Sequence, residues 1–536
     1  EEDRVLRSFY PSEARRRDLT YDCPIHATVT TTLEIEGCEP EISQNLRVVI
    51  GRMPIMLRTS LCYLTNMTPE ERIKAGECPY DNGGYFIIKG KERVLIPQLR
   101  CVYNVPKVFE QRAGDKYKYI VEIRSMSEET GHSSLLKAMI GSNNRTICFS
   151  IPYIKDIIPV GVVFKAMGYI KDEQIKDLIG LSDDKTEKYI RLILRDACLC
   201  NGDNDEQTRE NALKFIGQYA IHTLKDSERR NYAEQVICNE LFPHMGVTAN
   251  LKEKAYFLGF IVNKLLSTHV GLRKDDDRDD YINKRIESSG VLCYELFRQL
   301  FKKYCMSIIN SIEKKKQIPD AMSVITRLPV ITNGIRQCFG SGSWGVPKNS
   351  YIRTGVSQIL SRLSYGATLS HLRRITTPVG KESKNSKIRQ INASQIMYIC
   401  PAETPEGQPV GIVLNLSLLT RISERIPTVL VKSILEKCSN IVSIMNWDNP
   451  NDATKVFLNG YMLGMTYDPD DLLEEIIEMR NIKLLPWSIS ISHDDVDEEI
   501  NIYSDEGRLL RPVFDVKNNK LVITPEDGVN WDELLD

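Results

Sequence analysis

The sequence predicts a multidomain α+β protein, in which strand-rich and helix-rich segments follow one another. A chain of 536 residues is too long for a single hydrophobic core. Residues 1–126 read mostly as strands separated by turn residues, whereas residues 170–269 show the apolar spacing that is typical of helices. The C-terminal part combines both patterns, so we expect mixed β-sheets and helices.

Two hairpins are predicted from turn residues that lie between β-rich runs. The first joins runs at 85–88 and 93–96 through a glycine-containing loop of four residues. The second lies at 456–463, where Asn459 and Gly460 suit a type I′ turn.

Helices are predicted where apolar residues recur every three or four positions. A long helix is expected over 286–312, with its apolar stripe facing a core. The stripe consists of Leu292, Leu296, Leu300 and Tyr304, widened by Phe297, Phe301 and Ile308. Asp468 and Pro469 should begin another helix. Further candidates lie at 206–224, 228–242, 251–267, 351–363 and 367–374, with Gly366 breaking the last two apart.

Composition excludes several protein classes. Apolar residues make up 42% of the chain and charged residues 26%, as in ordinary soluble domains. The fourteen cysteines are scattered without a CxxC motif, and the seven histidines have no metal-ligand spacing, which argues against a disulfide scaffold or a zinc site. The most apolar run, 255–266, is too short for a bilayer. Because the chain opens on acidic residues, without Met or a signal peptide, we expect an intracellular fragment of a longer protein.

Residues 344–400 carry a local excess of positive charge. They include nine basic residues and one acid, Glu382, although the whole chain has 70 basic and 72 acidic residues. Such a local excess is typical of a surface that binds a polyanion. By contrast, residues 491–536 hold thirteen acids and four bases and should not face nucleic acid. The nine basic residues are Lys348, Arg353, Arg362, Arg373, Arg374, Lys381, Lys384, Lys387 and Arg389.

Part of this segment is predicted to be a loop. Residues 377–392 contain Pro, Gly, Ser and Asn and too few apolar side chains for a core element. The loop carries Lys381, Lys384, Lys387 and Arg389. Two interpretations are open: a solvated basic loop, or a cationic finger that follows the phosphates of a nucleic acid.

The motif CPAETPEGQPVG follows at 400–411. Glu403 and Glu406 invite an acid/base interpretation, but Pro401 and Pro405 oppose a regular helix. No neighbouring His, Cys or Ser completes a hydrolytic group. A structural loop whose carboxylates pair with nearby arginines is the simpler interpretation.

Two other groups of residues invite a chemical role. The run 275–280 places five carboxylates in six positions, as Mg²⁺ would require, but Lys274, Arg278 and Arg285 lie within or beside it. We therefore expect a solvated, internally salt-bridged surface. His371 is expected to pack or to form hydrogen bonds rather than to donate protons in catalysis.

Taken in order, these motifs resemble the fork region of the second-largest subunit of eukaryotic-type multisubunit DNA-directed RNA polymerases. The resemblance extends over nearly the whole chain. The fork motifs are GVSQ at 355–358, TLSHLRR at 368–374, TP-G at 377–380, RQ at 389–390 and CPAETPEGQ-G at 400–411. The earlier motifs are YP-EAR-R-LTY at 10–21, GR-PIMLR at 51–58, ECP at 77–79, GGYFI at 83–87, DDRD at 276–279 and KR at 284–285.

The resemblance implies a layout of named regions. It implies a protrusion at 1–126 that returns at 286–343, a lobe at 127–285, a fork at 344–423 and the start of an external domain at 424–536. It also implies that the DDRD motif is not the catalytic metal site. The family holds its active-site Mg²⁺ mainly on an aspartate triad of the largest subunit, so neither a catalytic residue nor a metal site is expected in this chain.

The resemblance further implies templated synthesis of RNA by a multisubunit complex. Its partners would be the largest subunit and other polymerase subunits, template DNA, nascent RNA and nucleoside triphosphates, without a membrane. The implied nucleic-acid-binding residues are Arg374, Lys381, Arg389, Gln358, Gln390 and Gln408. Glu406 would lie near the incoming nucleotide. Many relatives carry Arg where this chain has Lys381, which replaces a planar bidentate group by a point charge.

Two alternatives remain beside the polymerase interpretation. One is a nucleic-acid-binding module without a polymerase, and the other is a hydrolase that uses Glu403 and Glu406. A cellular member of the family would be nuclear, and a viral member would lie in the cytoplasm or the virion.

Overall fold

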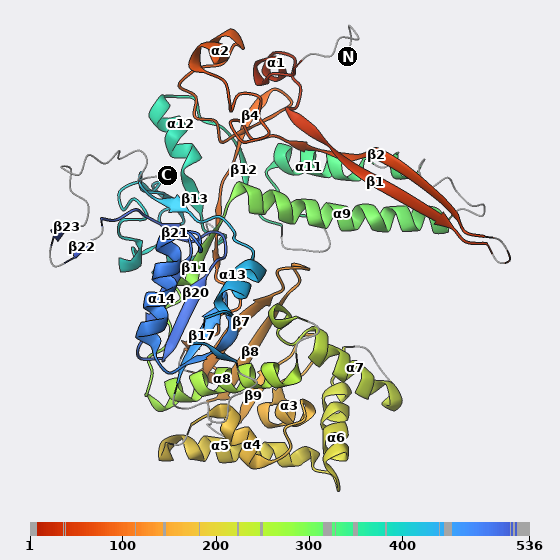
Figure 1. The fold of residues 1–536 in the computed structure, drawn as a ribbon, viewed down its shortest axis with the longest axis vertical. Helices are drawn as coiled ribbons and strands as arrows, with labels where there is room; N and C mark the ends of the chain where they lie inside the picture. Colours follow the sequence, from red (N-terminus) through yellow and green to blue (C-terminus); the bar gives the residue numbers. More distant parts are fainter. Residues whose placement is uncertain are drawn as a thin grey trace. The chain divides into compact units, whose positions relative to one another are not determined.

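The chain folds into two compact units (Figure 1), and each is described by itself. Unit 1 comprises Glu1–Arg100, Arg285–Arg421 and Arg511–Asp536, and unit 2 comprises Cys101–Lys284 and Ile422–Leu510. The computed structural model describes residues 8–35, 37, 39–112, 114–142, 146–181, 183–221, 225–246, 250–314, 324–326, 329–346, 352–380, 383–438, 440–443, 453–514, 516–517 and 520–521.

The borders of the two units can be set beside the predicted regions. Unit 2 begins at Cys101, whereas the predicted border at 126/127 falls just after strand β7 (Tyr117–Met126). The predicted borders at 285/286 and 423/424 lie within two residues of the ends of unit 2 segments. The names protrusion, lobe, fork and external domain stay predictions.

A small sheet with both faces buried forms the centre of unit 1. It contains β3 (Phe86–Ile88), β4 (Lys91–Leu95) and β12 (Ser357–Ile359) in the order β12-β4-β3. Phe86, Ile88 and Leu95 face one hydrophobic core, and Ile87 and Val94 face another. Because side chains alternate between the faces of a strand, β3, which is buried on both sides, is apolar throughout, whereas one end of β4 and one end of β12 are exposed.

The hairpin predicted at 85–96 is present, but its loop has two residues instead of four. Lys89 and Gly90 have φ values of 48° and 71°, as a type I′ turn requires. A Cβ on Gly90 would lie 2.4 Å from Oδ1 of Asp18, so the turn excludes larger residues. The predicted loop was too long because Lys91 and Glu92 pair within the hairpin.

A long two-stranded ribbon and two helices complete this part of unit 1. Strands β1 (Asp22–Leu33) and β2 (Glu41–Pro54) pair antiparallel. Helix α11 (Val330–Ser341) packs on β2 and on α9 (Ser289–Glu313), as Figure 1 shows. The core between them contains the side chains predicted for the α9 stripe, since Leu292, Leu296, Leu300 and Tyr304 are buried.

The predicted helix began too early in the sequence, and the predicted apolar stripe was too wide. The helix begins at Ser289 rather than at 286, because residues Lys284–Glu287 form strand β11. Phe301 is exposed, so the stripe that faces the core is narrower than predicted.

The helix predicted over 351–363 is wrong. In its place, β12 pairs antiparallel with β4, and Ser357 lies opposite Leu95. This pairing buries Val356 and Leu360, and such a tertiary gain outweighs local helix propensity. The next helix, α12 (Tyr365–Leu372), is present, but Gly366 lies within its first turn instead of breaking it.

A second sheet of unit 1 holds the strands that follow α12. Its order is β11-β5-β13-β14, with β5 at Gln98–Cys101, β13 at Arg374–Thr376 and β14 at Val413–Asn415. Two short helices, α1 (Pro11–Arg16) and α2 (Pro69–Lys74), also belong to unit 1.

In unit 2, a five-stranded sheet is covered by helices. Its order is β10-β9-β8-β7-β6, and α8 crosses its central strands (Figure 1). The helices predicted near 206, 228 and 251 are present as α6, α7 and α8. The elements are β6 (Lys107–Glu110), β7, β8 (Ser133–Gly141), β9 (Ile147–Ser150), β10 (Ile158–Pro159), α3 (Val160–Ala166), α4 (Asp172–Ile179), α5 (Asp184–Ala197), α6 (Asp205–Gln218), α7 (Asp226–Asn239) and α8 (Leu251–Val270).

A second sheet of unit 2 contains the hairpin predicted at 456–463. Asn459 and Gly460 join its strands with φ values of 51° and 82°, which confirms the type I′ turn. The predicted helix after Asp468 is present as α14, although the Asp468 side chain does not cap it. The elements are α13 (Thr428–Leu435), β16 (Val442–Ser443), β17 (Thr454–Leu458), β18 (Tyr461–Thr466), α14 (Pro469–Asn481), β19 (Ser490–Asp494) and β20 (Glu499–Tyr503).

The acidic run at 275–280 has a structural role through Asp276. Its carboxylate accepts a hydrogen bond from Arg273 at 2.8 Å and another from the backbone N–H of Val108 at 2.7 Å. The expected partner Arg278 instead lies 3.9 Å from the centre of the Phe109 ring. Asp276 is therefore salt-bridged, but it is largely buried rather than solvated, and its partner is not one of those expected.

Several absences hold for the part of the chain that the structure describes. No group of three or more His, Cys, Asp or Glu side chains there has an arrangement suited to a metal ion. None of the described helices combines the length and the apolarity that crossing a membrane would require.

The structure predicts that Asp276, but not its neighbour Asp275, stabilises unit 2. Burial raises the pKa of Asp276, but Arg273, Lys107 and the Val108 amide outweigh burial and hold the pKa below its ordinary value. We expect Asp276→Asn to lower the unfolding free energy by about 1.5–3 kcal/mol at pH 7. The loss should shrink as the pH falls below about 4, because the unfolded state then binds a proton that the folded carboxylate, with its lower pKa, does not yet bind.

Urea unfolding of the chain at pH 7 and pH 3.5 measures this effect. Asp275→Asn is the matched control, because Asp275 is exposed. Equal effects of the two substitutions, or saturable Mg²⁺ binding that disappears with Asp276→Asn, would contradict the structural role.

Candidate nucleic-acid interface

The candidate interface is built on strands that bring residues 355–416 together. In the sheet, Arg374 of β13 lies opposite Asn415 of β14. The backbone N–H of Cys400 donates to the carbonyl oxygen of Asn415 at 2.9 Å. The motif loop at 400–411 therefore begins beside Asn415, the residue opposite Arg374. It ends next to Ile412, whose carbonyl oxygen accepts from the backbone N–H of Thr377 at 3.0 Å.

His371 and Gln358 form an internal hydrogen-bonded pair. The Nδ1 atom of His371 accepts from the backbone N–H of Ser361 at 3.1 Å, so its Nε2–H donates to Oε1 of Gln358 at 3.0 Å. The Gln358 amide in turn donates to the carbonyl oxygen of Gly355 at 3.0 Å. Burial and the nearby Arg374 lower the pKa of His371 to about 4, so the ring is neutral at pH 7. These bonds occupy the Gln358 amide that we had expected to be available for nucleic acid.

Adjacent arginines at the start of β13 differ in their partners. The guanidinium of Arg373 donates to the carbonyl oxygens of Ser417, Leu418 and Thr420. Burial lowers its pKa below the ordinary value. The side chain of Arg374 has no hydrogen bond or ion pair within the described residues, and its Nε atom is buried without a partner. Arg374 therefore has side-chain donors without a partner in the described part of the chain.

Three contacts lock the 400–411 loop. The hydroxyl of Thr404 donates to the carbonyl oxygen of Val413 and accepts from the backbone N–H of Gly411, both at 3.0 Å. A Cβ on Gly411 would lie 2.5 Å from the carbonyl oxygen of Arg389, so only glycine fits there. Gly411 also has a φ of 70°. The loop is therefore held against the residues around Arg389.

Arg389 takes part in this lock, which the sequence did not suggest. Its guanidinium donates to the carbonyl oxygens of Gln408 at 2.5 Å, Val410 at 2.9 Å and Ser383 at 3.0 Å. Through these three hydrogen bonds, the side chain links the 377–392 loop to the 400–411 loop. A phosphate-binding role for Arg389 stays a prediction.

The polar side chains at the tip of the locked loop are exposed. Glu406 and Gln408 form no side-chain hydrogen bonds within the described residues, and the same is true of Gln390 on the neighbouring loop. Glu403 instead accepts a hydrogen bond from the Ser370 hydroxyl. The two carboxylates therefore have different environments, and neither pairs with an arginine as the simpler interpretation supposed.

The structure reduces the number of available cations. Of the nine basic residues, Arg353 and Arg362 form ion pairs inside unit 1, and Arg373 and Arg389 bind carbonyl oxygens. The cations without a described partner are Arg374, Lys384 and Lys387. Lys348 and Lys381 lie outside the described residues.

The acids that pair with these arginines lie outside the basic segment and could not be predicted from it. Arg353 pairs with Glu287, and Arg362 pairs with Glu92, which lies 270 positions earlier in the chain. A count of charges within one segment cannot detect partners at such a distance. The lock at Thr404 and Gly411 did have a local signal, because a loop with two glycines and several prolines favours fixed turns.

The neutral state of His371 predicts a pH dependence. Because its pKa is lower in the folded protein than the ordinary value of about 6.5, the stabilisation by neutral His371 is full above pH 6.5 and falls as the pH drops towards 4. The stability advantage of the wild type over His371→Asn should therefore narrow between pH 7.5 and pH 4.5. Thermal unfolding over this range measures it, and a constant difference would contradict the neutral-ring assignment.

Comparisons with known proteins cover most of the chain. Residues 1–337 match the family described as RNA polymerase beta subunit. Residues 358–422 and 456–517 match domains 3 and 4 of the RNA polymerase Rpb2 family.

Similar curated proteins come from a virus, a plant and an archaeon. The chain is 37% identical to a probable DNA-directed RNA polymerase II subunit RPB2 homolog of Invertebrate iridescent virus 6, over 97% of the chain and 46% of that protein. It is 36% identical to DNA-directed RNA polymerase II subunit 2 of Arabidopsis thaliana, over 98% of the chain and 46% of that protein. It is 31% identical to DNA-directed RNA polymerase subunit Rpo2 of Sulfolobus acidocaldarius, over 97% of the chain and 46% of that protein.

The chain spans about half the length of the curated relatives that it matches. The matched families cover the ribbon, both central sheets and the locked loop of unit 1 as well as most of unit 2. The chain therefore belongs to the RNA polymerase beta subunit family, the second-largest subunits of multisubunit RNA polymerases.

Proposed function

We propose that this chain acts as part of a DNA-directed RNA polymerase, in which it forms cleft walls and the fork during templated RNA synthesis. The activity would belong to the assembled complex. The missing half of the subunit, the largest subunit and other polymerase subunits would be its protein partners. Template DNA, nascent RNA and nucleoside triphosphates would be the other ligands.

One observation carries this proposal. The locked loop presents Glu406 and Gln408 next to a strand on which Arg374 has no described partner. An unpaired, half-buried guanidinium is costly to keep unless a ligand completes its hydrogen bonds. A DNA or RNA phosphate meets that need, because it accepts charge-assisted hydrogen bonds from arginine.

The available groups suggest distinct roles. Arg374, Lys384 and Lys387 would bind phosphates near the point of strand separation, together with Lys381. Gln390 and Gln408, which can donate and accept, would contact bases, sugars or phosphates of the RNA–DNA hybrid. Glu406 would lie near the incoming nucleotide or orient a basic partner. Gln358 and Arg389 would act mainly by positioning these groups, since their own donors are engaged.

The active-site Mg²⁺ would lie elsewhere in the complex, mainly on the largest subunit. The described residues of this chain do not fit such a site, because they include no suitable group of metal-binding side chains.

We also infer the layout of regions from the family: a protrusion at 1–126 and 286–343, a lobe at 127–285, a fork at 344–423 and the start of an external domain beyond. A cellular complex would act in the nucleus, and a viral one in the cytoplasm or the virion.

The isolated chain should not synthesise RNA. Without metal ions held in line with the phosphates, phosphoryl transfer lacks its main electrostatic stabilisation. A primed-template extension assay with Mg²⁺ and all four nucleotides tests this, with a complete multisubunit RNA polymerase as positive control. Nucleotide-dependent extension by the chain alone would overturn the proposed division of labour between subunits.

The salt dependence of DNA binding tests the role of Arg374. Each lost phosphate contact should flatten the log–log slope of affinity against salt by about 0.9 on duplex DNA. We expect this change for Arg374→Ala and for each of Lys381→Ala, Lys384→Ala and Lys387→Ala. Lys302→Ala on α9, also an exposed lysine, is the matched control and should leave the slope unchanged. Unchanged slopes in all four variants would show that these residues do not bind phosphates and would contradict the proposed role of the fork.

Arg389 should behave differently in the same experiment. Because its side chain makes three hydrogen bonds within the protein, Arg389→Ala should lower the unfolding free energy by roughly 1.5–3 kcal/mol. Arg374→Ala should cost little stability, since its side chain makes no described bond. Thermal unfolding of both variants, measured beside the salt series, distinguishes a residue that stabilises the fold from one that binds a phosphate. A larger stability loss for Arg374→Ala would reverse the two roles.

A further inference from the structure

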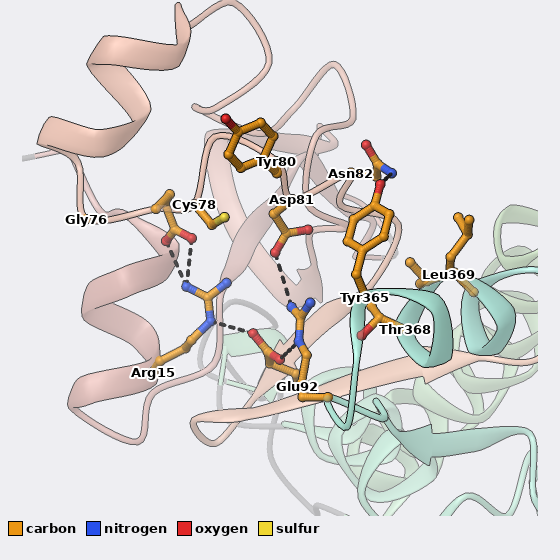
Figure 2. A pocket seen from close by; sticks show the side chains of 13 residues that line it. Arg15, Gly76, Cys78, Tyr80, Asp81, Asn82, Glu92, Tyr365, Thr368 and Leu369 are labelled. Atoms are coloured by element: carbon orange, nitrogen blue, oxygen red, sulfur yellow. Dashed lines mark hydrogen bonds and ion pairs between the residues drawn. The ribbon is translucent and has the colours of Figure 1, made fainter.

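A charged pocket in unit 1 is not used by the proposed nucleic-acid interface. Its volume is about 330 Å³, and it is lined by α1, the loop before β3, β4, and α12 with the residues before it. Figure 2 shows Arg15, Glu92 and Asp81 pointing into it, with Tyr80 and Tyr365 at its edges. This volume lies at the lower end of the range for ligand pockets, roughly 300–1,000 Å³.

The walls of the pocket are preorganised by ion pairs. Arg15 donates to both oxygens of Glu77 and to one oxygen of Glu92, each at 2.8 Å. Arg362 donates to the other oxygen of Glu92 at 2.7 Å and to Asp81 at 3.1 Å. Glu92 thus bridges the two guanidinium groups (Figure 2). A network satisfied in this way holds its shape before a ligand arrives.

The pocket carries an excess of negative charge. Three carboxylates (Glu77, Asp81 and Glu92) face two guanidinium groups. Burial raises the pKa of Glu77, and Arg15 offsets this only in part. Each Glu92 oxygen has accepted one described hydrogen bond and retains a second lone pair. The pocket can therefore accept donors from a cation.

The edge of the pocket is aromatic and apolar. Tyr80 is 79% exposed and Tyr365 is 63% exposed, and both line the pocket. The Asn82 amide donates to the Tyr365 hydroxyl at 3.0 Å and so fixes the direction of that ring. Large side chains exposed together at a pocket mark a contact surface. Aromatic faces also attract cations.

We propose that this pocket receives a lysine or arginine side chain from a partner polypeptide, with apolar neighbours of that side chain packing on Tyr80 and Tyr365. The cationic group would bind Glu92 between the two arginines. Arg362 keeps one terminal nitrogen without a described partner, and this nitrogen would donate to a backbone carbonyl of the incoming segment. A phosphate-bearing ligand does not fit, because three carboxylates would repel it.

Disulfide exchange at Cys78 tests the charge preference. Cys78 lines the pocket and is exposed, and Cys198 in unit 2 is an exposed internal reference. The chain is treated with equal amounts of cystamine and dithiodipropionate, and the mixed disulfides at each cysteine are measured by peptide mass spectrometry. The ratio of cationic to anionic adduct should be roughly threefold or more higher at Cys78 than at Cys198, as a local potential of about one kT or more gives. Glu92→Gln should lower this ratio. Equal ratios, or an anionic excess at Cys78, would overturn the proposal.

Peptide binding tests the docking itself. The probes are rhodamine-labelled pentapeptides Gly-Leu-X-Leu-Gly in which X is Arg, Gln or Glu, followed by fluorescence anisotropy with the full chain. The Arg peptide should bind most tightly, and Tyr80→Ala or Tyr365→Ala should weaken it by roughly fivefold or more, because the leucines of the peptide lose a ring on which they pack. Both tyrosines are exposed, so these variants should fold. Tyr294→Ala, at an exposed tyrosine of α9, is the control. Tightest binding of the Glu peptide, no binding of any peptide up to millimolar concentration, or no effect of either tyrosine substitution would overturn the proposal.

Discussion

The pairing of β12 with β4 is the constraint on which the rest of unit 1 depends. It places Ser357 opposite Leu95, although the two residues lie more than 260 positions apart in the chain. Both faces of the resulting sheet are buried, so a change of register by one residue would exchange the two cores. The Glu92 carboxylate strengthens the same junction, because it accepts hydrogen bonds from Arg15 on one side and from Arg362 on the other. Helix α12, which carries the neutral His371, follows β12 in the chain, and Glu92 of β4 lines the charged pocket. The locked loop lies between the next two strands, β13 and β14.

The arginines of unit 1 illustrate how a buried partner changes the function of a charge. The guanidinium groups of Arg353, Arg362, Arg373 and Arg389 each donate to acceptors within the protein, whereas that of Arg374 has no described partner. The sequence counts all five equally. Only the fold separates the arginines that bind within the protein from the one without a described partner. The positive charge available to nucleic acid is therefore smaller and more localised than the composition of the segment indicates.

Local signals predicted the elements that local physics determines. The Asn459-Gly460 turn and the buried stripe of α9 were predictable because a positive φ and a helical period each leave a direct mark on the sequence. The strand at Ser357–Ile359 was predicted as helix because its stability comes from a partner strand far away in the chain. The same reason explains why the sequence did not reveal the internal contacts of Arg389 and Gln358. Their residue types suggested contacts with nucleic acid, but the carbonyl oxygens and the imidazole that bind them become neighbours only in the folded chain.

Unit 1 consequently carries two surfaces with opposite charge preferences, and these preferences follow from how its ion pairs are completed. At the interface, the cations Arg374, Lys384 and Lys387 have no described acidic partners, so a polyanion can pair with them. In the pocket, three carboxylates share two arginines, so a cation can complete the network. Binding at the interface should weaken steeply with salt because it displaces counterions from a nucleic acid. Binding in the pocket should depend on salt less, since the ion pairs there are partly buried and screening acts mainly on exposed charges. A protein partner and a nucleic acid can then occupy the same unit without competing for the same charges.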